Sequence, residues 1–281
     1  MRTPERLRFG APLAAIVAAL TTAVAHAQSE PSDGLRYDLR VDIPVTAGAV
    51  GLGIAMELLK DALAPRSCRL CGVDGLDALA RGALRWNDTG AANTMSNWTG
   101  FVLTPVTALA GCEVAAAADH RFHDAPSNAL VVVEATALAV ALDDAVKLLV
   151  ARQRPYAHFR DPGEPAPPDT DENLSFYSGH TNLAFTVAVA SGTVASMRGY
   201  RLASVVWATS LPMAAVTGYL RIAADKHYLT DVLTGALIGS AVGFLVPFAF
   251  HRAPAATVDP VATGAMPVLG RGPFVTSSWT F

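Results

Sequence analysis

The chain has 281 residues, of which 52% are hydrophobic and 16% are charged, and its formal net charge at pH 7 is -3. The length suits a single domain with tails, and the composition, more apolar than that of an ordinary soluble domain, favours a membrane protein. The net charge excludes the basic surface that nucleic acids require, so we expect no nucleic-acid partner.

The first segment, residues 1–27, has the layout of an export signal. Three arginines precede an apolar stretch, which ends in the small-x-small sequence AHA at 25–27. This layout favours a secretory signal peptide cleaved before Gln28. An uncleaved signal anchor is the alternative, because the apolar run is nearly long enough to span a bilayer.

Residues 28–94 are expected to form an N-terminal extension with one helix, over 43–63. The cysteines of the chain are Cys68 and Cys71, in the sequence CRLC, and Cys112. An exported protein meets an oxidising compartment, where Cys68 and Cys71 could form a sterically tight disulfide. A zinc site would need a second pair of ligands, which this sequence lacks, so we expect no metal and no other cofactor.

Apolar segments without strand-like alternation recur along the chain and predict helices, which makes the fold class all-α. Their ranges are 43–63, 98–118, 128–152, 180–197, 202–220 and 228–250. The last two are the most membrane-like, whereas the first three carry charges that are costly in lipid unless they face the interior of a bundle. The Pro- and acid-rich stretch 159–173 is expected to be an exposed loop, and the end of the tail a short strand.

The first candidate cluster lies at the end of the helix predicted over 128–152. Lys147 and Arg154 are seven residues apart, so both cations leave the same helical face over two turns, and Pro155 ends the helix beside them. The ordinary alternative is that Lys147 pairs with Asp143, four residues earlier, and that Arg154 is a solvated terminal charge.

Ser178, Gly179 and His180 form the second cluster, where a polar loop turns into an apolar run. Ser178 is a good N-cap residue, and in that interpretation His180 is incidental. The alternative is an anion site, because the start of a helix offers unpaired N–H groups and the positive end of the helix dipole.

The third cluster consists of Arg221, His227 and Asp231, between the last two predicted helices. His227 and Asp231 are one helical turn apart, so the carboxylate could accept a hydrogen bond from one imidazole nitrogen and leave the other free as a nucleophile. The plain alternative is a surface His–Asp pair with an unrelated arginine nearby.

All three clusters fall at helix ends, and antiparallel packing of successive helices brings those ends to one side of a bundle. Together they supply three cations, backbone amides and two histidines, the composition of a phosphate site with a nucleophile. The set resembles the three-part signature of the type 2 phosphatidic acid phosphatase family: Lys147 with Arg154-Pro155, Ser178-Gly179-His180, and Arg221 with His227 and Asp231.

The resemblance implies the helical bundle that this family shares with bacterial acid phosphatases and vanadium haloperoxidases, here embedded in a membrane. The phosphatase core would occupy 95–252, followed by a tail at 253–281. Two positions depart from the family's pattern, because Tyr177 stands where a proline precedes Ser-Gly-His, and Leu220 where a serine precedes the arginine. Neither change removes a reacting group, so they bear on rate and substrate preference.

On these residues the resemblance implies a metal-free phosphomonoesterase. Lys147, Arg154 and Arg221 would hold the phosphoryl oxygens, together with the N–H groups of Ser178 and Gly179.

The two histidines would share the chemistry. His227 would attack phosphorus and become a phosphohistidine, with Asp231 fixing its tautomer. His180 would protonate the departing alkoxide and then activate the water that frees phosphate.

The alternatives are a vanadium-dependent haloperoxidase, a periplasmic non-specific acid phosphatase, and a non-catalytic membrane protein that binds anionic lipid heads. The apolar chain favours a phosphorylated lipid as substrate. Phosphatidic acid, phosphatidylglycerol phosphate, undecaprenyl diphosphate and lipid A phosphates all present a phosphate beside an apolar anchor, and the sequence does not separate them.

Basic residues near short loops mark the cytoplasmic side of a membrane. Arg198 and Arg201, in the loop MRGYR, and Arg252 after the last helix stand at helix ends opposite to the three clusters. We therefore expect an inner-membrane protein, surrounded by membrane lipids, with its active site facing the periplasm. A wholly periplasmic bundle is the alternative, and the sequence does not indicate an oligomeric state.

Overall fold

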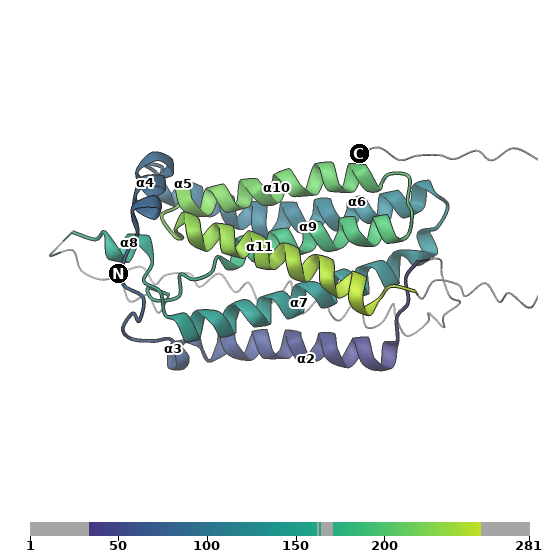
Figure 1. The fold of residues 1–281 in the computed structure, drawn as a ribbon, viewed down its shortest axis with the longest axis horizontal. Coiled ribbons are helices and arrows are strands. Elements are labelled where there is room, and N and C mark those ends of the chain that lie inside the picture. The colour runs from purple at the N-terminus through teal and green to yellow at the C-terminus, as the bar shows by residue number, and fades with distance from the viewer. Residues whose placement is uncertain (1–33, 162, 164–170, 254–281) are drawn as a thin grey trace, which may run out of the picture.

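The fold is a bundle of long helices, given by a computed structural model that describes residues 34–161, 163 and 171–253 (Figure 1). The longer elements are α2 (Leu39–Leu58), α6 (Thr104–Ala118), α7 (Ala125–Val150), α9 (Gly179–Met197), α10 (Ala203–Ala223) and α11 (Leu229–Leu245). The shorter ones are α3 (Lys60–Leu63), α4 (Gly75–Leu84), α5 (Thr89–Trp98), η1 (Thr99–Leu103), η2 (Phe122–Asp124), α8 (Pro155–His158) and η3 (Val246–Phe250). The prediction of an all-α bundle is confirmed.

Helix α9 is the centre of the bundle, and α6, α7, α10 and α11 pack around it. Helix α11 approaches it closely through Gly235, Gly239 and Gly243, which recur every four residues and so share one face. A Cβ atom added at any of them would lie 2.4 to 2.7 Å from a backbone oxygen of α9 or of Ser178 just before it. The small residues therefore set the start of α11 beside the start of α9.

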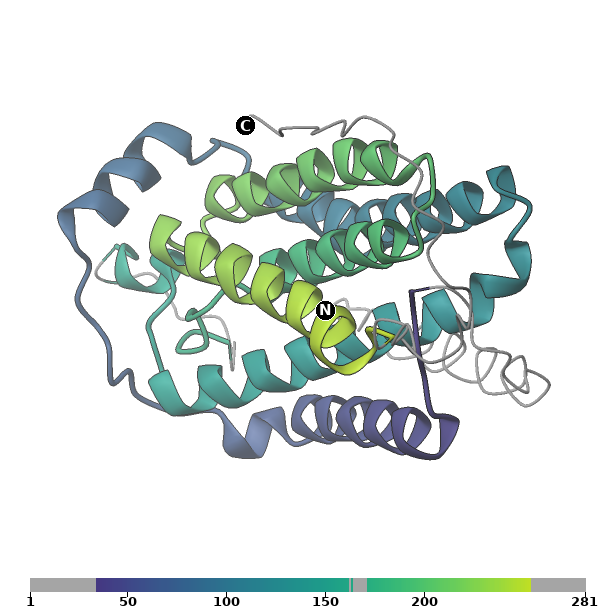
Figure 2. The same ribbon diagram turned by 45° about the vertical axis from the view of Figure 1, so that its right-hand side comes forward.

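The termini of four long helices lie at one end of the bundle. There α7 and α10 end and α9 and α11 begin, with the short helices α4 and α8 nearby, at the left of Figure 1. The opposite end carries the turns from α6 to α7 and from α9 to α10, and Figure 2 shows the same separation from another side.

The helix predicted over 98–118 is longer at its start than expected. Helix α5 begins at Thr89, after the N-cap Asp88, and continues through the π-helical turn η1 into α6. The side chain of Asp88 accepts a hydrogen bond from the Ala91 N–H, which satisfies one of the free donors of the first turn. Residues 28–94, where one helix was expected, also hold α4.

Four helices of the described part of the chain are long and apolar enough to cross a membrane. They are Leu39–Leu58, Thr89–Ala118, Ala203–Ala223 and Leu229–Phe250. In each of them, most residues are not buried by the rest of the bundle, as in helices that face lipid. Glu134 and Asp143 of α7 are buried in the bundle, as expected for charges that face the interior, whereas Glu57 of α2 is exposed.

Cys68 and Cys71 form a disulfide between α3 and α4, with their Cα atoms 5.4 Å apart, and Cys112 is a buried free cysteine. The disulfide loop pairs with the segment that follows α7, because Leu70 and Arg152 form an isolated β-bridge. The expected export signal at 1–27 and the expected strand of the tail lie outside the described residues.

Candidate active site

The structure places the three predicted clusters at the same end of the bundle. Lys147 lies in the last turn of α7, and Arg154 lies just before α8. Ser178 precedes α9, and Gly179 and His180 lie in the first turn of that helix. Arg221 lies in the last turn of α10, His227 between α10 and α11, and Asp231 in the first turn of α11. Direct contacts join them across the sequence. A guanidinium nitrogen of Arg154 lies 3.3 Å from Nε2 of His227, for example.

His227 is buried, and its two ring nitrogens have different surroundings. Nδ1 lies 2.8 Å from the carbonyl oxygen of Ser175. A carbonyl can only accept, so Nδ1 carries the hydrogen and Nε2 keeps its lone pair. Burial and the positive charges of Arg154 and Arg221 hold the pKa of His227 well below its usual value. The ring is therefore neutral at physiological pH, with Nε2 as its basic atom.

Asp231 lies close to His227 but does not accept the predicted hydrogen bond from it, because Oδ2 is 3.7 Å from Nδ1, beyond hydrogen-bond distance. Its carboxylate accepts instead from the hydroxyl of Ser175 at 2.6 Å and from the Tyr228 N–H at 3.0 Å. Arg152 also donates to it, at 2.5 Å. Asp231 thus fixes Ser175, whose carbonyl orients His227, and its influence on the imidazole is indirect.

The three cations are held by different partners. Lys147 lies 2.5 Å from Asp143, the pairing considered from the sequence, and Arg154 donates from Nε to the Asp171 carbonyl at 2.8 Å. The buried Arg221 donates to Asn93 at 2.9 Å and to Ser96 at 3.0 Å. Its Nε has no hydrogen-bond partner within the described part of the chain. A buried donor of this kind is costly unless a ligand accepts from it.

The start of α9 differs in one respect from the predicted anion site. The Ser178 N–H donates to the Asp231 carbonyl at 3.1 Å, so it is committed to holding α11. The Ser178 hydroxyl pairs with that of Thr181 at 2.9 Å and does not cap the helix. Gly179 remains in the first turn, and a Cβ there would lie 2.6 Å from both Asp143 Oδ2 and Lys147 Nζ. The glycine therefore lets the Lys147–Asp143 pair lie against the positive end of α9.

His180 is positioned by residues that the sequence analysis did not single out. Its Nε2 lies 2.8 Å from Oδ1 of Asn97, and its ring packs on Phe101 with 4.3 Å between the centroids. Asn97 shares the inner face of α5 with Asn93 and Ser96, which contact Arg221. The signal was present in the sequence NTMSN, where polar side chains recur three and four residues apart on one helical face.

Asp171 balances the positive charge at the edge of the site. Burial would raise the pKa of its carboxyl group, but Arg154 and Lys60 outweigh that effect and lower it to about 2. His158, four residues after Arg154, is exposed on α8, and His120 and His123 lie between α6 and α7 at the other end of the bundle.

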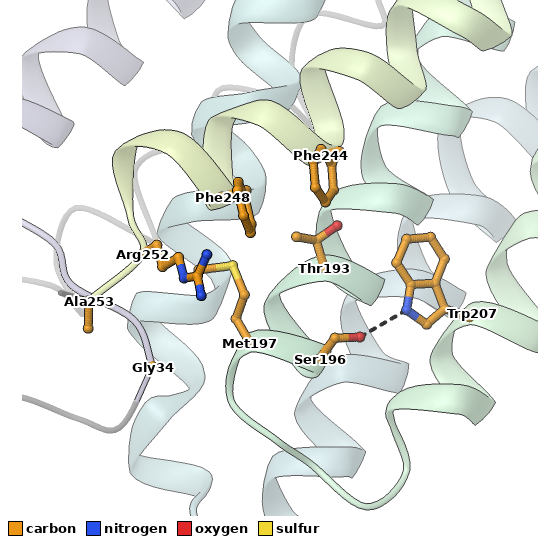
Figure 3. Close-up of a pocket in the computed structure, with 9 residues that line it drawn as sticks. All are labelled: Gly34, Thr193, Ser196, Met197, Trp207, Phe244, Phe248, Arg252 and Ala253. Carbon is orange, nitrogen blue, oxygen red and sulfur yellow. Dashed lines mark hydrogen bonds between the residues drawn. The ribbon is translucent and has the colours of Figure 1, made fainter. Parts of the chain in front are cut away.

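A separate hollow of about 540 Å³ lies at the other end of α9, between α9, α10 and α11 (Figure 3). Phe244, Phe248 and Trp207 line it, and Ser196 accepts a hydrogen bond from the indole of Trp207 at 3.0 Å. The hollow holds none of the predicted site residues, so it is distinct from the candidate active site.

Comparisons with known proteins give one family match and one similar solved structure. Residues 128–254 match the model of the PAP2 superfamily, a range that contains all the predicted site residues. A solved structure, described as the first transmembrane PAP2 type phosphatidylglycerolphosphate phosphatase from Bacillus subtilis, is 18% identical with a TM-score of 0.37, and the match covers 84% of this chain and 92% of that one. Curated protein sequences give no match.

Proposed function

We propose that the chain is a phosphatase of the PAP2 type, as the match of residues 128–254 to the superfamily model supports, and that it hydrolyses a lipid phosphate through a phosphohistidine on His227. One observation carries the proposal. His227 is buried and neutral, Ser175 holds its Nδ1 hydrogen, and Nε2 is left beside the guanidinium of Arg154. A nucleophile for phosphorus needs a fixed tautomer, an unprotonated nitrogen and adjacent positive charge, and His227 has all three.

The reaction then follows from the arrangement. Lys147, Arg154 and Arg221 bind the phosphoryl oxygens and stabilise the charge that spreads over them in the transition state. Nε2 of His227 forms a bond to phosphorus while the bond to the lipid oxygen breaks, and His180 gives that oxygen a proton. Water, deprotonated by His180, then attacks phosphorus, and the P–N bond breaks to release phosphate and restore the imidazole.

Two features of the bundle support a lipid as the substrate. Four described helices are apolar and long enough to span a bilayer, which supports a membrane protein. The cationic site lies at one end of these helices, which is where a lipid phosphate would meet water in a bilayer that they span. A headgroup could enter it while the acyl chains stay in the membrane.

We propose that the active site faces the periplasm. The Cys68–Cys71 disulfide lies at the active-site end, and structural disulfides persist in oxidising compartments. Arg198 and Arg201 follow α9 at the opposite end, where basic loop residues favour the cytoplasm.

Phosphate release tests this proposal. The panel is phosphatidic acid, phosphatidylglycerol phosphate and undecaprenyl diphosphate in mixed micelles, with p-nitrophenyl phosphate as a soluble ester. We expect at least one lipid to give a higher kcat/KM than the soluble ester, competitive inhibition by orthovanadate, and loss of release in His227→Asn. Equal kcat/KM values would indicate a non-specific acid phosphatase, and peroxide-dependent halide oxidation with vanadate but no phosphate release would indicate a haloperoxidase.

A further inference from the structure

Three residues that could bind a metal meet inside the bundle, away from the phosphatase site. Asp42 lies in the first turn of α2, Glu134 in the third turn of α7, and His251 directly after η3. All three are buried, and each offers one ligand atom within 4.8 Å of the others. They lie toward the end of the bundle where α2 begins and α11 finishes, opposite to His227 (Figure 1).

Two atoms of this cluster are about as far apart as two ligands of one metal ion. Nε2 of His251 and Oε2 of Glu134 are 3.5 Å apart, and neither atom has a hydrogen-bond partner in the described part of the chain. That separation is long for a direct hydrogen bond. Two ligands bound to a tetrahedral zinc ion at about 2.1 Å each would lie about 3.4 Å apart.

The surroundings of His251 are those of a metal-binding histidine. Its Nδ1 lies 3.1 Å from the carbonyl oxygen of Arg36, so Nδ1 donates, and Nε2 faces Glu134 as the nitrogen that would bind an ion. A backbone carbonyl that fixes the tautomer in this way is the usual second partner of a metal-bound imidazole. Asp42 is oriented similarly, because its Oδ2 accepts from the Asp38 N–H at 2.7 Å.

Charge also points to a cation. The cluster holds two buried carboxylates beside a single imidazole, and buried negative charge is costly without a compensating cation. Two basic residues adjacent to His251 have other partners: Arg36 donates to the Phe250 carbonyl, and the guanidinium of Arg252 lies over the Phe248 ring. Thr46, one turn beyond Asp42 on the same face of α2, adds a buried hydroxyl that lacks a partner among the described residues.

We propose that Asp42, Glu134 and His251 bind a divalent transition-metal ion, with zinc as the best match to one imidazole and two carboxylates. The ion fastens α2 and the end of α11 to α7, so that its role is to stabilise the bundle. It lies apart from the phosphate site, and this inference does not depend on the proposed function.

Zinc binding to the full-length, tag-free chain in detergent tests the proposal. After dialysis against EDTA, we expect the protein to bind one Zn²⁺ per chain in a calorimetric titration. Saturating zinc should raise the midpoint of thermal unfolding by about 5 °C or more, because the ion binds the folded state alone. Phosphate release at 25 °C should be the same before and after the dialysis.

Matched variants locate the ion. Glu134→Gln and His251→Gln should each abolish the zinc titration and the zinc-dependent rise in midpoint. Glu57→Gln, on the exposed surface of α2, and His123→Gln, an exposed histidine, should leave both unchanged. An unaltered midpoint of the wild-type protein with zinc would overturn the proposal even if the cluster variants did not fold. Equal zinc binding by folded cluster variants would overturn it as well, and would leave a proton shared between His251 and the carboxylates.

Discussion

Replacing Gly179 with alanine should impair phosphate transfer without weakening the fold. The added Cβ would lie 2.6 Å from Asp143 Oδ2 and from Lys147 Nζ, about 1 Å inside ordinary contact distance. Both atoms are ends of flexible side chains, so the pair moves rather than the backbone. The cation that we assign to the phosphoryl group is then displaced from the start of α9.

The expected size follows from the interaction that is lost. A hydrogen bond to a charged group contributes about 1.5–3 kcal/mol, which corresponds to a kcat/KM lower by roughly 10- to 100-fold. Alanine is favoured over glycine in helices by about 0.5–1 kcal/mol, so the thermal midpoint should not fall. Hydrolysis of p-nitrophenyl phosphate and thermal unfolding measure the two quantities on one sample.

Two further variants make this test specific. Gly48→Ala, on α2, adds a Cβ that meets nothing within 4 Å and should leave kcat/KM unchanged. Adding Lys147→Gln to Gly179→Ala should lower kcat/KM little further, because both changes remove the same contact. Wild-type kcat/KM in Gly179→Ala, or fully additive losses in the double variant, would refute the reasoning.

Three other expectations concern His180, the pH profile and the topology. Asn97→Ala should lower kcat by roughly 10-fold and leave KM nearly unchanged, because it frees the ring that transfers the proton; steady-state kinetics would contradict this if KM alone changed. Because the pKa of His227 is depressed, kcat/KM should fall with decreasing pH only below the usual range for histidine. Arg154→Gln removes a positive neighbour and should move this acid limb of the pH profile to higher pH. An acid limb that stays in place would show that another group controls it. In a chain with its native cysteines replaced by serine, an impermeant thiol reagent on intact cells should label a cysteine at the exposed His158 and not one at the exposed Arg201; labelling of both would indicate a wholly periplasmic bundle, and labelling of 201 alone a cytoplasmic active site.

The sequence predicted the bundle and the three clusters because their signals are local. Long apolar runs mark the helices, and Lys147, Ser178 and Arg221 stand where those runs begin or end. Antiparallel packing was then sufficient to bring the clusters to one end of the fold.

The role of α5 was not predicted, because its first turns look like a loop. The sequence TGAANTMSN is rich in glycine, threonine and asparagine, which are poor helix formers. The N-cap Asp88 and the contacts of Asn93 and Asn97 with Arg221 and His180 stabilise it as a helix. Those contacts join residues far apart in the chain, and no local pattern contains them.

The bond predicted between His227 and Asp231 failed for a geometric reason. The one-turn spacing faces two side chains only when both residues are helical, and α11 begins after His227, at Leu229. The carboxylate of Asp231 therefore turns back to cap the Tyr228 N–H, and His227 binds the carbonyl of Ser175 instead.

The most direct test of the account is to trap a phosphoryl group on His227. In His180→Ala, an activated ester such as p-nitrophenyl phosphate can still leave without a proton donor, whereas the water that completes the cycle is no longer activated. Rapid quenching at alkaline pH, followed by mass spectrometry, should then find one phosphoryl group on the peptide that contains His227. The phosphoryl group should be missing from His180→Ala/His227→Asn, and equal labelling of both variants, or its attachment to another residue, would contradict the account.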